Sequence, residues 1–386
     1  MKIGIVTYWK STDNYGEQLQ NYALQEYLRG LGHEPFLIRY DYEADTIYGT
    51  KPLPVRLLRA CSPKRLAAYF KSRKNNRMYR KNCLEHPRGF DEFRKEHLSM
   101  SRVYSSIEDL RNDPPEADMY ITGSDQVWNT FGGKFSEMKN RLSAFFLDFG
   151  KEDVKRISYA ASWGRSRISD EESELIRPLL ARFDAVSVRE ASGIDVCSRL
   201  GREDALLAPD PTLLHDAETY HCLYEDSGVK VPDGKYLFFY FMNHDGNYDR
   251  KAVFDWAKAR DLKVVYVTDD WNDEFERSFP DVAGWLKLID NAEYVVTNSF
   301  HCSVFSLIFG KKLGVIKRSG SYTGMNTRID SLFESCGAAP RYIEGNDFGI
   351  LDRPADRADM TGMAGSVKPD DVIMAAVKGA SEKHGN

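Results

Sequence analysis

The stretch "KIGIVTYWKSTDNYGEQLQNYALQEYLRGLG", residues 2–32, shows how the chain begins to fold. It opens with an apolar, β-rich run and continues with the turn-forming "KSTDNYG". Apolar residues then recur at helical spacing as far as Gly32, where the helix is expected to end. The next segment, "HEPFLIRYDY", again has the character of a strand. These residues predict a βαβ unit, from which parallel sheets are built.

The remainder of the chain repeats this alternation in two halves. Strand-like segments recur through residues 117–208 and again through 235–318, and "PDPTLL" at 209–214 lies between them. Because its two prolines disfavour a continuous helix or strand, we expect it to link two domains, residues 1–208 and 209–386, the second ending in a C-terminal helix. The fold class expected is α/β, with two Rossmann-like domains facing a cleft at their strand ends.

The composition is that of an ordinary globular protein. Apolar residues make up 42% of the chain and charged residues 29%, and the net charge of -5 gives no reason to expect nucleic acid as a partner. The sequence has no run of about eighteen apolar residues and no leader-like start, so a cytoplasmic protein is expected. The six cysteines form no metal-like group with the eight histidines, so we expect free thiols and no metal.

One segment differs in charge from the rest. Residues 51–97 contain 14 Lys or Arg against 4 Asp or Glu. Two interpretations stay open: a solvated helical insertion, or a docking surface for a phosphate-bearing acceptor or an anionic membrane leaflet.

Two loops in the first half place polar and aromatic side chains just beyond a strand. The loop at residues 11–18 opens the first helix, where amides can hold an anion or a sugar hydroxyl and Gly16 allows close approach. In "GSDQVWN", residues 123–129, an indole beside fixed polar groups is typical of sugar binding, although a capped turn over a packed tryptophan is an equal alternative. The candidate residues are Asn14, Tyr15, Gly16, Gln18, Ser124, Asp125, Gln126 and Trp128.

A third candidate region lies in the second half. In "AEYVVTNSFHCSVFSLIFGKK", residues 292–312, Asn298 to His301 fall at a strand-to-helix turn, where a histidine can act as acid, base or phosphate donor. A structural histidine is the alternative. Adjacent helical residues do not face each other, so no nucleophilic pair of His301 with Cys302 is expected.

Two arginines are candidates for binding an anion. Arg189 ends a strand in "DAVSVRE", and Arg328 precedes an amphipathic helix in "NTRIDSLF". Each offers planar, bidentate contacts to carboxylate or phosphate, or else pairs with a neighbouring acid or caps a helix.

Taken in order, these segments resemble the polysaccharide pyruvyl transferase family. The resemblance rests on "IGIVTYWKSTDNYGEQLQNYALQEYL", "YITGSDQVWN", "ISYAASWG", "SVREASG", "DPTLL", "VTNSFHCSVFSLIFGKKLGVI" and "NTRIDSLFESCG". It implies a two-domain fold like that of the GT-B glycosyltransferases and an enzyme that moves an enolpyruvyl group from phosphoenolpyruvate to a sugar. The product implied is a cyclic pyruvate ketal on a cell-surface polysaccharide precursor, formed without a cofactor.

The resemblance also implies roles for these residues. The donor would lie against the second domain and the acceptor against the loops of the first. His301 and Arg189 carry over directly to the family's motifs, and Asn298, Ser299 and Arg328 complete the expected donor set. His301 would supply a proton or stabilise the leaving phosphate. We assign to Asp125, by our own inference, the deprotonation of a sugar hydroxyl.

The chain departs from the family next to this histidine. Many members have arginine two residues before it and glycine after it, whereas this chain has Ser299 and Cys302. Arg328, Lys317 or Arg318 would have to compensate, or the donor differs. Two other functions therefore stay open: a GT-B glycosyltransferase using a nucleotide sugar, and a non-catalytic glycan-assembly protein. A lipid-linked acceptor and peripheral contact with the inner membrane are further expectations from the basic segment.

Overall fold

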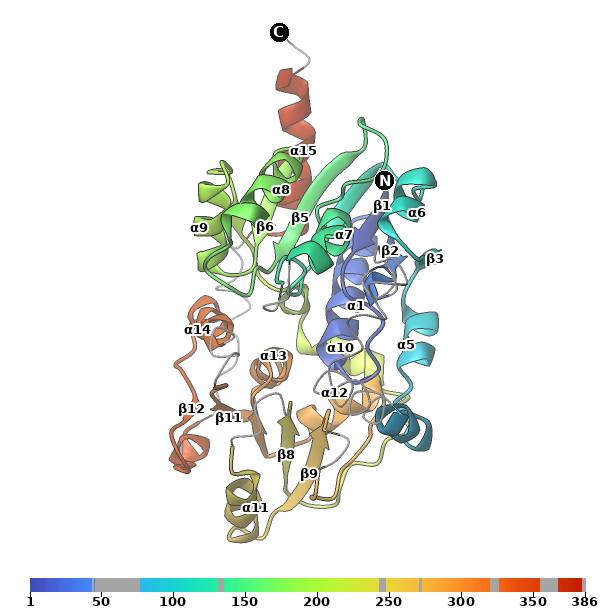
Figure 1. The fold of residues 1–386 in the computed structure, drawn as a ribbon. Helices are drawn as coiled ribbons and strands as arrows, with labels where there is room; N and C mark the ends of the chain where they lie inside the picture. The colour runs from blue at the N-terminus through green and yellow to red at the C-terminus, as the bar shows by residue number, and fades with distance from the viewer. Residues whose placement is uncertain are drawn as a thin grey trace, which may run out of the picture.

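The computed structural model describes residues 1–43, 45, 77–130, 135–242, 248–270, 273–319, 326–354 and 367–383. Within these residues the chain forms two separate β-sheets, one from each half of the chain, with helices packed around them (Figure 1). The sheets lie in different parts of the molecule, so each half builds its own core.

The first sheet has seven described strands, all paired in parallel, in the order β3-β2-β1-β4-β5-β6-β7. This is a doubly wound order whose direction reverses between β1 and β4, which places a crevice at the carboxyl ends of those two strands. The strands are β1 (Lys2–Val6), β2 (Glu34–Tyr40), β3 (Met100–Tyr104), β4 (Met119–Thr122), β5 (Lys155–Ala161), β6 (Ala185–Val188) and β7 (Leu206–Leu207).

The second sheet has five described strands, also parallel, in the order β12-β11-β10-β8-β9. Its order reverses between β8 and β10. The strands are β8 (Tyr236–Phe241), β9 (Lys263–Thr268), β10 (Tyr294–Thr297), β11 (Lys312–Ile316) and β12 (Tyr342–Ile343). The prediction of two Rossmann-like domains in a GT-B-like arrangement is confirmed by these two sheets.

Helices connect and cover the strands. They are α1 (Tyr15–Gly30), α5 (Phe90–His97), α6 (Ile107–Asn112), α7 (Phe135–Phe145), α8 (Asp170–Leu180), α9 (Ala191–Arg199), η1 (Pro211–Leu214), α10 (Ala217–Tyr224), α11 (Arg250–Lys258), α12 (Val282–Asp290), α13 (Phe300–Ile308), α14 (Asn326–Ser335), η3 (Gly349–Asp352) and α15 (Pro369–Lys383). None of the described helices is long and apolar enough to cross a membrane.

The C-terminal helix does not pack where its position in the chain suggested. Although the sequence grouped α15 with the second domain, Val372 and Ile373 lie in one buried cluster with Ile157 and Tyr159 of β5. This cluster also holds Leu24 of α1, so α1 and α15 cover the same face of the first sheet. The apolar face of β5 therefore draws the end of the chain back to the first domain.

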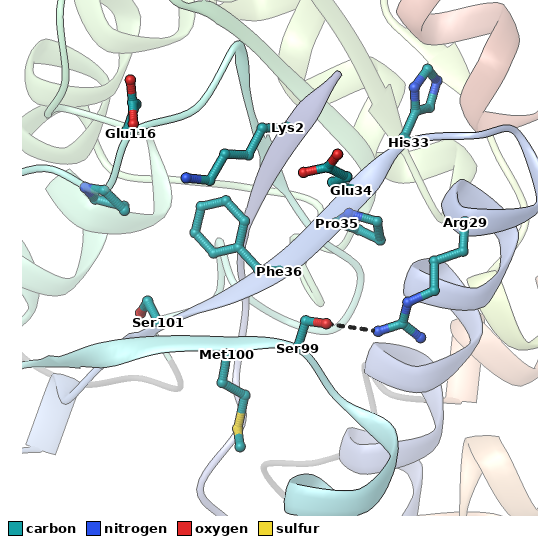
Figure 2. A pocket seen from close by; sticks show the side chains of 11 residues that line it. Lys2, Arg29, His33, Glu34, Pro35, Phe36, Ser99, Met100, Ser101 and Glu116 are labelled. Atoms are coloured by element: carbon teal, nitrogen blue, oxygen red, sulfur yellow. Dashed lines mark hydrogen bonds between the residues drawn. The ribbon is translucent and has the colours of Figure 1, made fainter.

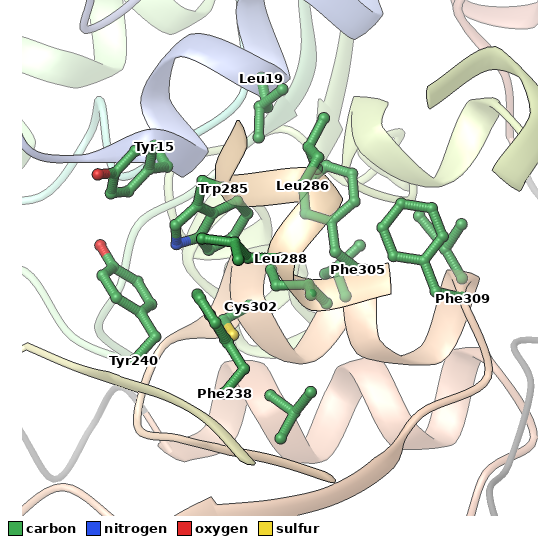
Figure 3. Close-up of a cluster of buried hydrophobic side chains, with 14 of the residues drawn as sticks. Tyr15, Leu19, Phe238, Tyr240, Trp285, Leu286, Leu288, Cys302, Phe305 and Phe309 are labelled. Atoms are coloured by element: carbon green, nitrogen blue, oxygen red, sulfur yellow. The ribbon is translucent and has the colours of Figure 1, made fainter. Parts of the chain in front are cut away.

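The two domains are joined by a shared apolar core. Tyr15 of α1 stacks on Trp285 of α12 with ring centres 5.1 Å apart, and its hydroxyl donates to the carbonyl of Pro280 at 2.8 Å. Figure 3 shows Tyr15 and Leu19 of α1 facing Trp285 and other side chains of the second domain. The first turn of α1 is thus fixed to the second domain.

The basic segment lies partly outside the described residues, which exclude 51–76. Residues 77–85 are helical, and Tyr79 donates to Asp13 Oδ2 at 3.0 Å. The end of this segment therefore borders the loop that opens α1. Its proposed contact with phosphate or membrane stays a prediction.

We expect Tyr15→Ala to lower the free energy of unfolding by about 3–5 kcal/mol, because it removes a fully buried ring from the contact between domains. Tyr15→Phe keeps the ring and loses only the bond to Pro280, at a cost of about 0.5–1.5 kcal/mol. Urea unfolding of both variants checks this. Equal losses would show that the hydroxyl, and not the stacking, holds the domains together.

Candidate functional site

The reversal points of the two sheets face each other across a cavity of about 660 Å³. The first domain lines it with residues after β1 and β4, among them Asn14 and Asp125. The second domain lines it with Met242 after β8, residues 299–301 after β10, and Arg328 of α14. Open parallel sheets bind ligands at such points, so both domains contribute their expected site to one cavity.

A buried carboxylate close to His301 joins three segments of chain. Asp210 Oδ2 accepts hydrogen bonds from Ser124 Oγ at 2.9 Å and Arg189 Nη1 at 2.6 Å. Its Oδ1 accepts from the backbone N–H and the hydroxyl of Thr212 at 3.1 and 2.7 Å. His301 Nε2 lies 3.6 Å from Oδ2. The segment that the sequence presented as a linker therefore carries the central acid of the site.

Asp210 stays ionised despite its complete burial. Burial alone would raise its pKa, but interactions with His301 and Arg189 and the hydrogen bond from Thr212 hold the pKa well below its usual value. Such a carboxylate can hold the imidazole in place and balance the charge when the ring takes up a proton. His301 Nε2 has no hydrogen-bond partner among the described residues.

The imidazole of His301 lies directly against Gly16. A Cβ atom added at Gly16 would lie 2.1 Å from His301 Nδ1 and 2.7 Å from its Cβ. The sequence predicted that Gly16 permits close approach to a ligand. In the structure the group that approaches is His301, which places this ring between α1 and Asp210.

The second group of note is a buried guanidinium without a counter-ion. Arg328 is only 7% exposed, and the described structure gives it neither a hydrogen bond nor an ion pair. Its Cζ lies 4.8 Å from the centre of the Phe300 ring, and Cζ of Arg189 lies 4.7 Å from the same ring. Burial, reinforced by the charge of Arg189, lowers the pKa of Arg328 to about 9. An anion in the cavity would compensate this charge.

The other expected donor residues have different positions. Ser299 caps α13 and lines the cavity, whereas the side chain of Asn298 bonds both backbone groups of Met242 and ties β10 to β8. Of the two compensating cations, Arg318 lines the cavity, while Lys317 pairs with Glu344 on the surface.

Arg189 does not line the cavity itself. Its Nη1 is committed to Asp210 and Ser124, and Nη2 lies 3.9 Å from Asp125 Oδ1. We expected it to hold the donor directly. In the structure it lies against the Phe300 ring, binds Asp210 and adds positive potential.

The wall formed by the first domain is rich in aromatic rings and carboxylates. Tyr8 and Tyr42 line it, with ring centres 5.1 Å apart, as do Asp13 and Glu17. Apolar ring faces combined with fixed hydrogen-bonding groups are typical of sugar sites. This wall therefore suits the acceptor side that the family resemblance implied.

Three predicted acceptor residues lie elsewhere. Trp128 is completely buried, stacks on Phe146 and donates its Nε1–H to the Phe145 carbonyl, so it offers no face to a sugar. Tyr15 belongs to the contact between domains, and Gln18 donates to the carbonyl of Trp9. For Trp128 the packed-tryptophan alternative is the one observed.

Two further predicted residues do reach the cavity. Asp125 adopts a positive φ of 83°, and its Oδ1 accepts from the backbone N–H of Gln126 at 2.8 Å. Both residues line the cavity. Asp125 thus keeps one carboxylate oxygen for a ligand, and the strained turn holds it at the end of β4.

Sequence reasoning missed Asp210, Glu17 and the tyrosines of the first wall. The signal for Asp210 was present, since an acid directly after a strand and between two prolines lies at a sheet edge. Glu17 gave no such signal, because acids are common in the first turn of any helix.

The remaining side chains at the site limit its chemistry. Burial raises the pKa of Cys302 to about 12, so its thiol stays protonated and is no nucleophile. The described residues contain no group of three or more His, Cys, Asp or Glu suited to a metal.

A second cavity, about 710 Å³, lies at the opposite ends of the first strands. Figure 2 shows Lys2, Glu34 and Phe36 around it, with Arg29 donating to Ser99. None of the predicted site residues lines it. It is open to the amino ends of β1 and β2, away from the reversal points of either sheet.

The comparisons with known proteins bear on the family. The sequence pattern described as polysaccharide pyruvyl transferase matches residues 14–320, more than three quarters of the chain. The chain belongs to this family. Members are transferases acting on polysaccharides, and the match includes His301 and Asp210, while Arg328 lies just beyond it. No curated protein matches the chain.

Solved structures show a more distant similarity. UDP-GlcNAc 2-epimerase from Methanocaldococcus jannaschii, in complex with UDP-GlcNAc and UDP, is 12% identical with a TM-score of 0.48 and 91% coverage of both chains. The enzyme of that name from Neisseria meningitidis, bound to UDP-GlcNAc, is 10% identical with a TM-score of 0.47 and 99% coverage of both. Similarity at this level does not extend to activity.

We expect Gly16→Ala to lower kcat at least tenfold with little loss of stability, because the new methyl group displaces the His301 ring while alanine itself favours the helix. Turnover and urea unfolding are measured on the same preparation. The His301→Gly variant removes both the ring and the Cβ that the new methyl group meets, so adding Gly16→Ala to it should lower kcat no further. An additional loss in that double variant would place the effect of Gly16 elsewhere.

We expect Asp210→Asn to cost about 3–5 kcal/mol at neutral pH, because Arg189 then keeps a buried charge without its partner. Since folding lowers the pKa of Asp210, its contribution is complete above the unfolded-state value of about 3.9 and is lost as the pH falls through the folded-state value. Denaturant unfolding should show a constant difference from wild type between about pH 5 and 8 that shrinks at lower pH.

Asp204→Asn is the matched control, since Asp204 pairs with Arg202 at the surface with 63% of its side chain exposed. We expect it to cost less than about 1 kcal/mol. A pH-independent loss in Asp210→Asn would show that its charge is not what matters.

Proposed function

We propose that this protein transfers the enolpyruvyl group of phosphoenolpyruvate to two hydroxyls of a glycan precursor and forms a pyruvate ketal. The proposal rests on the family, on the aromatic and acidic first wall, and above all on Arg328. Arg328 is a buried cation that lines the cavity together with His301, and among the described residues it has neither a hydrogen bond nor an ion pair.

Phosphoenolpyruvate has the charges that the cationic residues of this cavity would recognise. Phosphoenolpyruvate carries a phosphate and a carboxylate on one small planar carbon frame, so it needs several cationic or N–H donor groups close together. Arg328 and Arg318 line the cavity, and the backbone N–H groups at the start of α13 add positive potential. Arg318 takes the place of the arginine that many family members have at position 299.

The reaction balances with the groups present. A proton adds to the methylene carbon of the donor, a sugar oxygen bonds to its C2, phosphate leaves, and a second oxygen closes the ring. The two sugar hydroxyls release two protons. One replaces the proton that was added to the methylene carbon, and the other leaves with phosphate. Asp125 accepts a hydroxyl proton, and His301, supported by Asp210, faces the leaving phosphate. This scheme needs no metal and no cofactor.

The experiment measures phosphate release from phosphoenolpyruvate with a panel of nitrophenyl hexosides that carry free neighbouring hydroxyl pairs. We expect Arg328→Met to raise KM for phosphoenolpyruvate at least tenfold. Because methionine removes an uncompensated buried charge without opening a cavity, we expect no loss of stability. Release of a nucleoside diphosphate from a nucleotide sugar, with none from phosphoenolpyruvate, would instead favour a glycosyltransferase.

Arg260→Met is the control, since Arg260 lies at the surface against Trp256 and Asp352. It should leave KM unchanged. An unchanged KM in Arg328→Met as well would remove Arg328 from the donor site.

A further inference from the structure

Glu17 is an acid of the cavity that has no role in the reaction proposed above. Glu17 lies in the first turn of α1, one residue after Gly16, and is only 5% exposed. It lines the same cavity as Asp125 and Arg328. The question is whether this carboxyl group only supports its loop or takes part in the reaction.

The two oxygens of Glu17 are in different situations. Oε1 accepts from the backbone N–H of Ser11 at 2.8 Å and from Gln18 Nε2 at 3.1 Å. The described structure gives Oε2 no hydrogen-bond partner. One oxygen is thus anchored and fixes the orientation of the group, while the other is left for a ligand in the cavity.

The surroundings of Glu17 favour its protonated form. Burial raises the pKa of Glu17 to about 8, the Ser11 N–H opposes this, and the charge of Asp125 adds to it. Arg94 of α5 lowers the pKa and Asp13 of the same loop raises it, both by smaller amounts. Near neutral pH the group is therefore a neutral acid able to donate a proton.

The other titratable groups around Glu17 come from neighbouring elements. Tyr8 and Tyr42 lie close enough for the charge of Glu17 to raise their own pKa values, and Lys10, Glu43 and Arg141 line the same cavity. Lys10 is paired with Asp41 and Glu43. Its charge is thus already balanced within the first domain.

We propose that Glu17 is the acid that protonates the methylene carbon of phosphoenolpyruvate. This inference rests on the proposed function. The electron pair of the donor's C=C bond takes the proton from the Glu17 carboxyl and forms the new C–H bond of the methyl group. The resulting carboxylate then accepts the proton of the hydroxyl that closes the ketal ring, which restores the acid. Asp125 accepts the other hydroxyl proton and passes it to the departing phosphate.

This division of roles gives separate functions to the two acids that line one cavity with His301. It separates carbon protonation on the side of α1 from phosphate departure on the side of α13. In this assignment His301 interacts with the leaving phosphate, and Arg328 lines the same cavity. Protonation of the carbon needs a carboxylic acid, whereas deprotonation of the first hydroxyl needs a carboxylate. One carboxyl group cannot be in both states at the same time.

The test compares wild type with Glu17→Gln, using phosphoenolpyruvate and the nitrophenyl hexoside that gives the highest wild-type rate. Glutamine keeps the bond from Ser11 and the neutral charge but has no acidic proton. We expect kcat to fall by about 100- to 10,000-fold, with KM for phosphoenolpyruvate changed less than about threefold. The wild-type rate should decline as the pH rises through about 8, and the residual rate of the variant should lack that decline.

Glu26→Gln is the matched control on the same helix, where Glu26 pairs with Arg29 near the surface. It should match wild type in rate and pH profile. A Glu17→Gln enzyme with an unchanged kcat, or one that retains the alkaline decline, would overturn the assignment while leaving the transfer reaction intact. Absence of phosphate release from wild type on every hexoside would instead overturn the transfer reaction, and the role of Glu17 with it.

Discussion

The site depends on one buried carboxylate. Asp210 is the meeting point of the two sheet edges, because it binds Ser124 after β4, Arg189 after β6 and its own η1 while facing His301 of α13. A buried charge of this kind is tolerated only when every partner is in place. Misplacing Ser124, Arg189 or Thr212 would leave a buried charge poorly compensated, so these bonds hold Asp210 at the strand ends of the first domain, where His301 faces it.

Much of the fold follows from local sequence pattern. The apolar run before Asn14, the cap that Asn14 provides and the return strand through Tyr40 define β1, α1 and β2 without help from the rest of the chain. The same is true of β10 and α13, where Ser299 starts the helix at Phe300. The pattern did not predict the placement of α15, because the apolar face of an amphipathic helix does not indicate which sheet it will cover.

The site was predicted less completely, for a physical reason. Residue type shows what a side chain can do, but burial and partners decide whether it does so. Trp128 and Tyr15 have the chemistry of sugar-binding rings, yet tertiary packing uses both in the core. Asp210 was predicted only as part of the link between the domains, since only the folded chain brings Arg189 and His301 to it. His301 and Arg328 line the cavity, as expected for residues that follow the strands of a parallel sheet, and their roles stay predictions.

The stacking of Tyr15 on Trp285 sets how the molecule can open. Since the first turn of α1 is attached to the second domain, a relative movement of the two sheets that keeps this contact would turn about it, one residue before Gly16, which lies against His301. Groups near this contact would keep their spacing, while cavity residues farther from it would move more. Domain motion would then alter the width of the entrance and leave the arrangement of Gly16, Glu17 and His301 nearly unchanged.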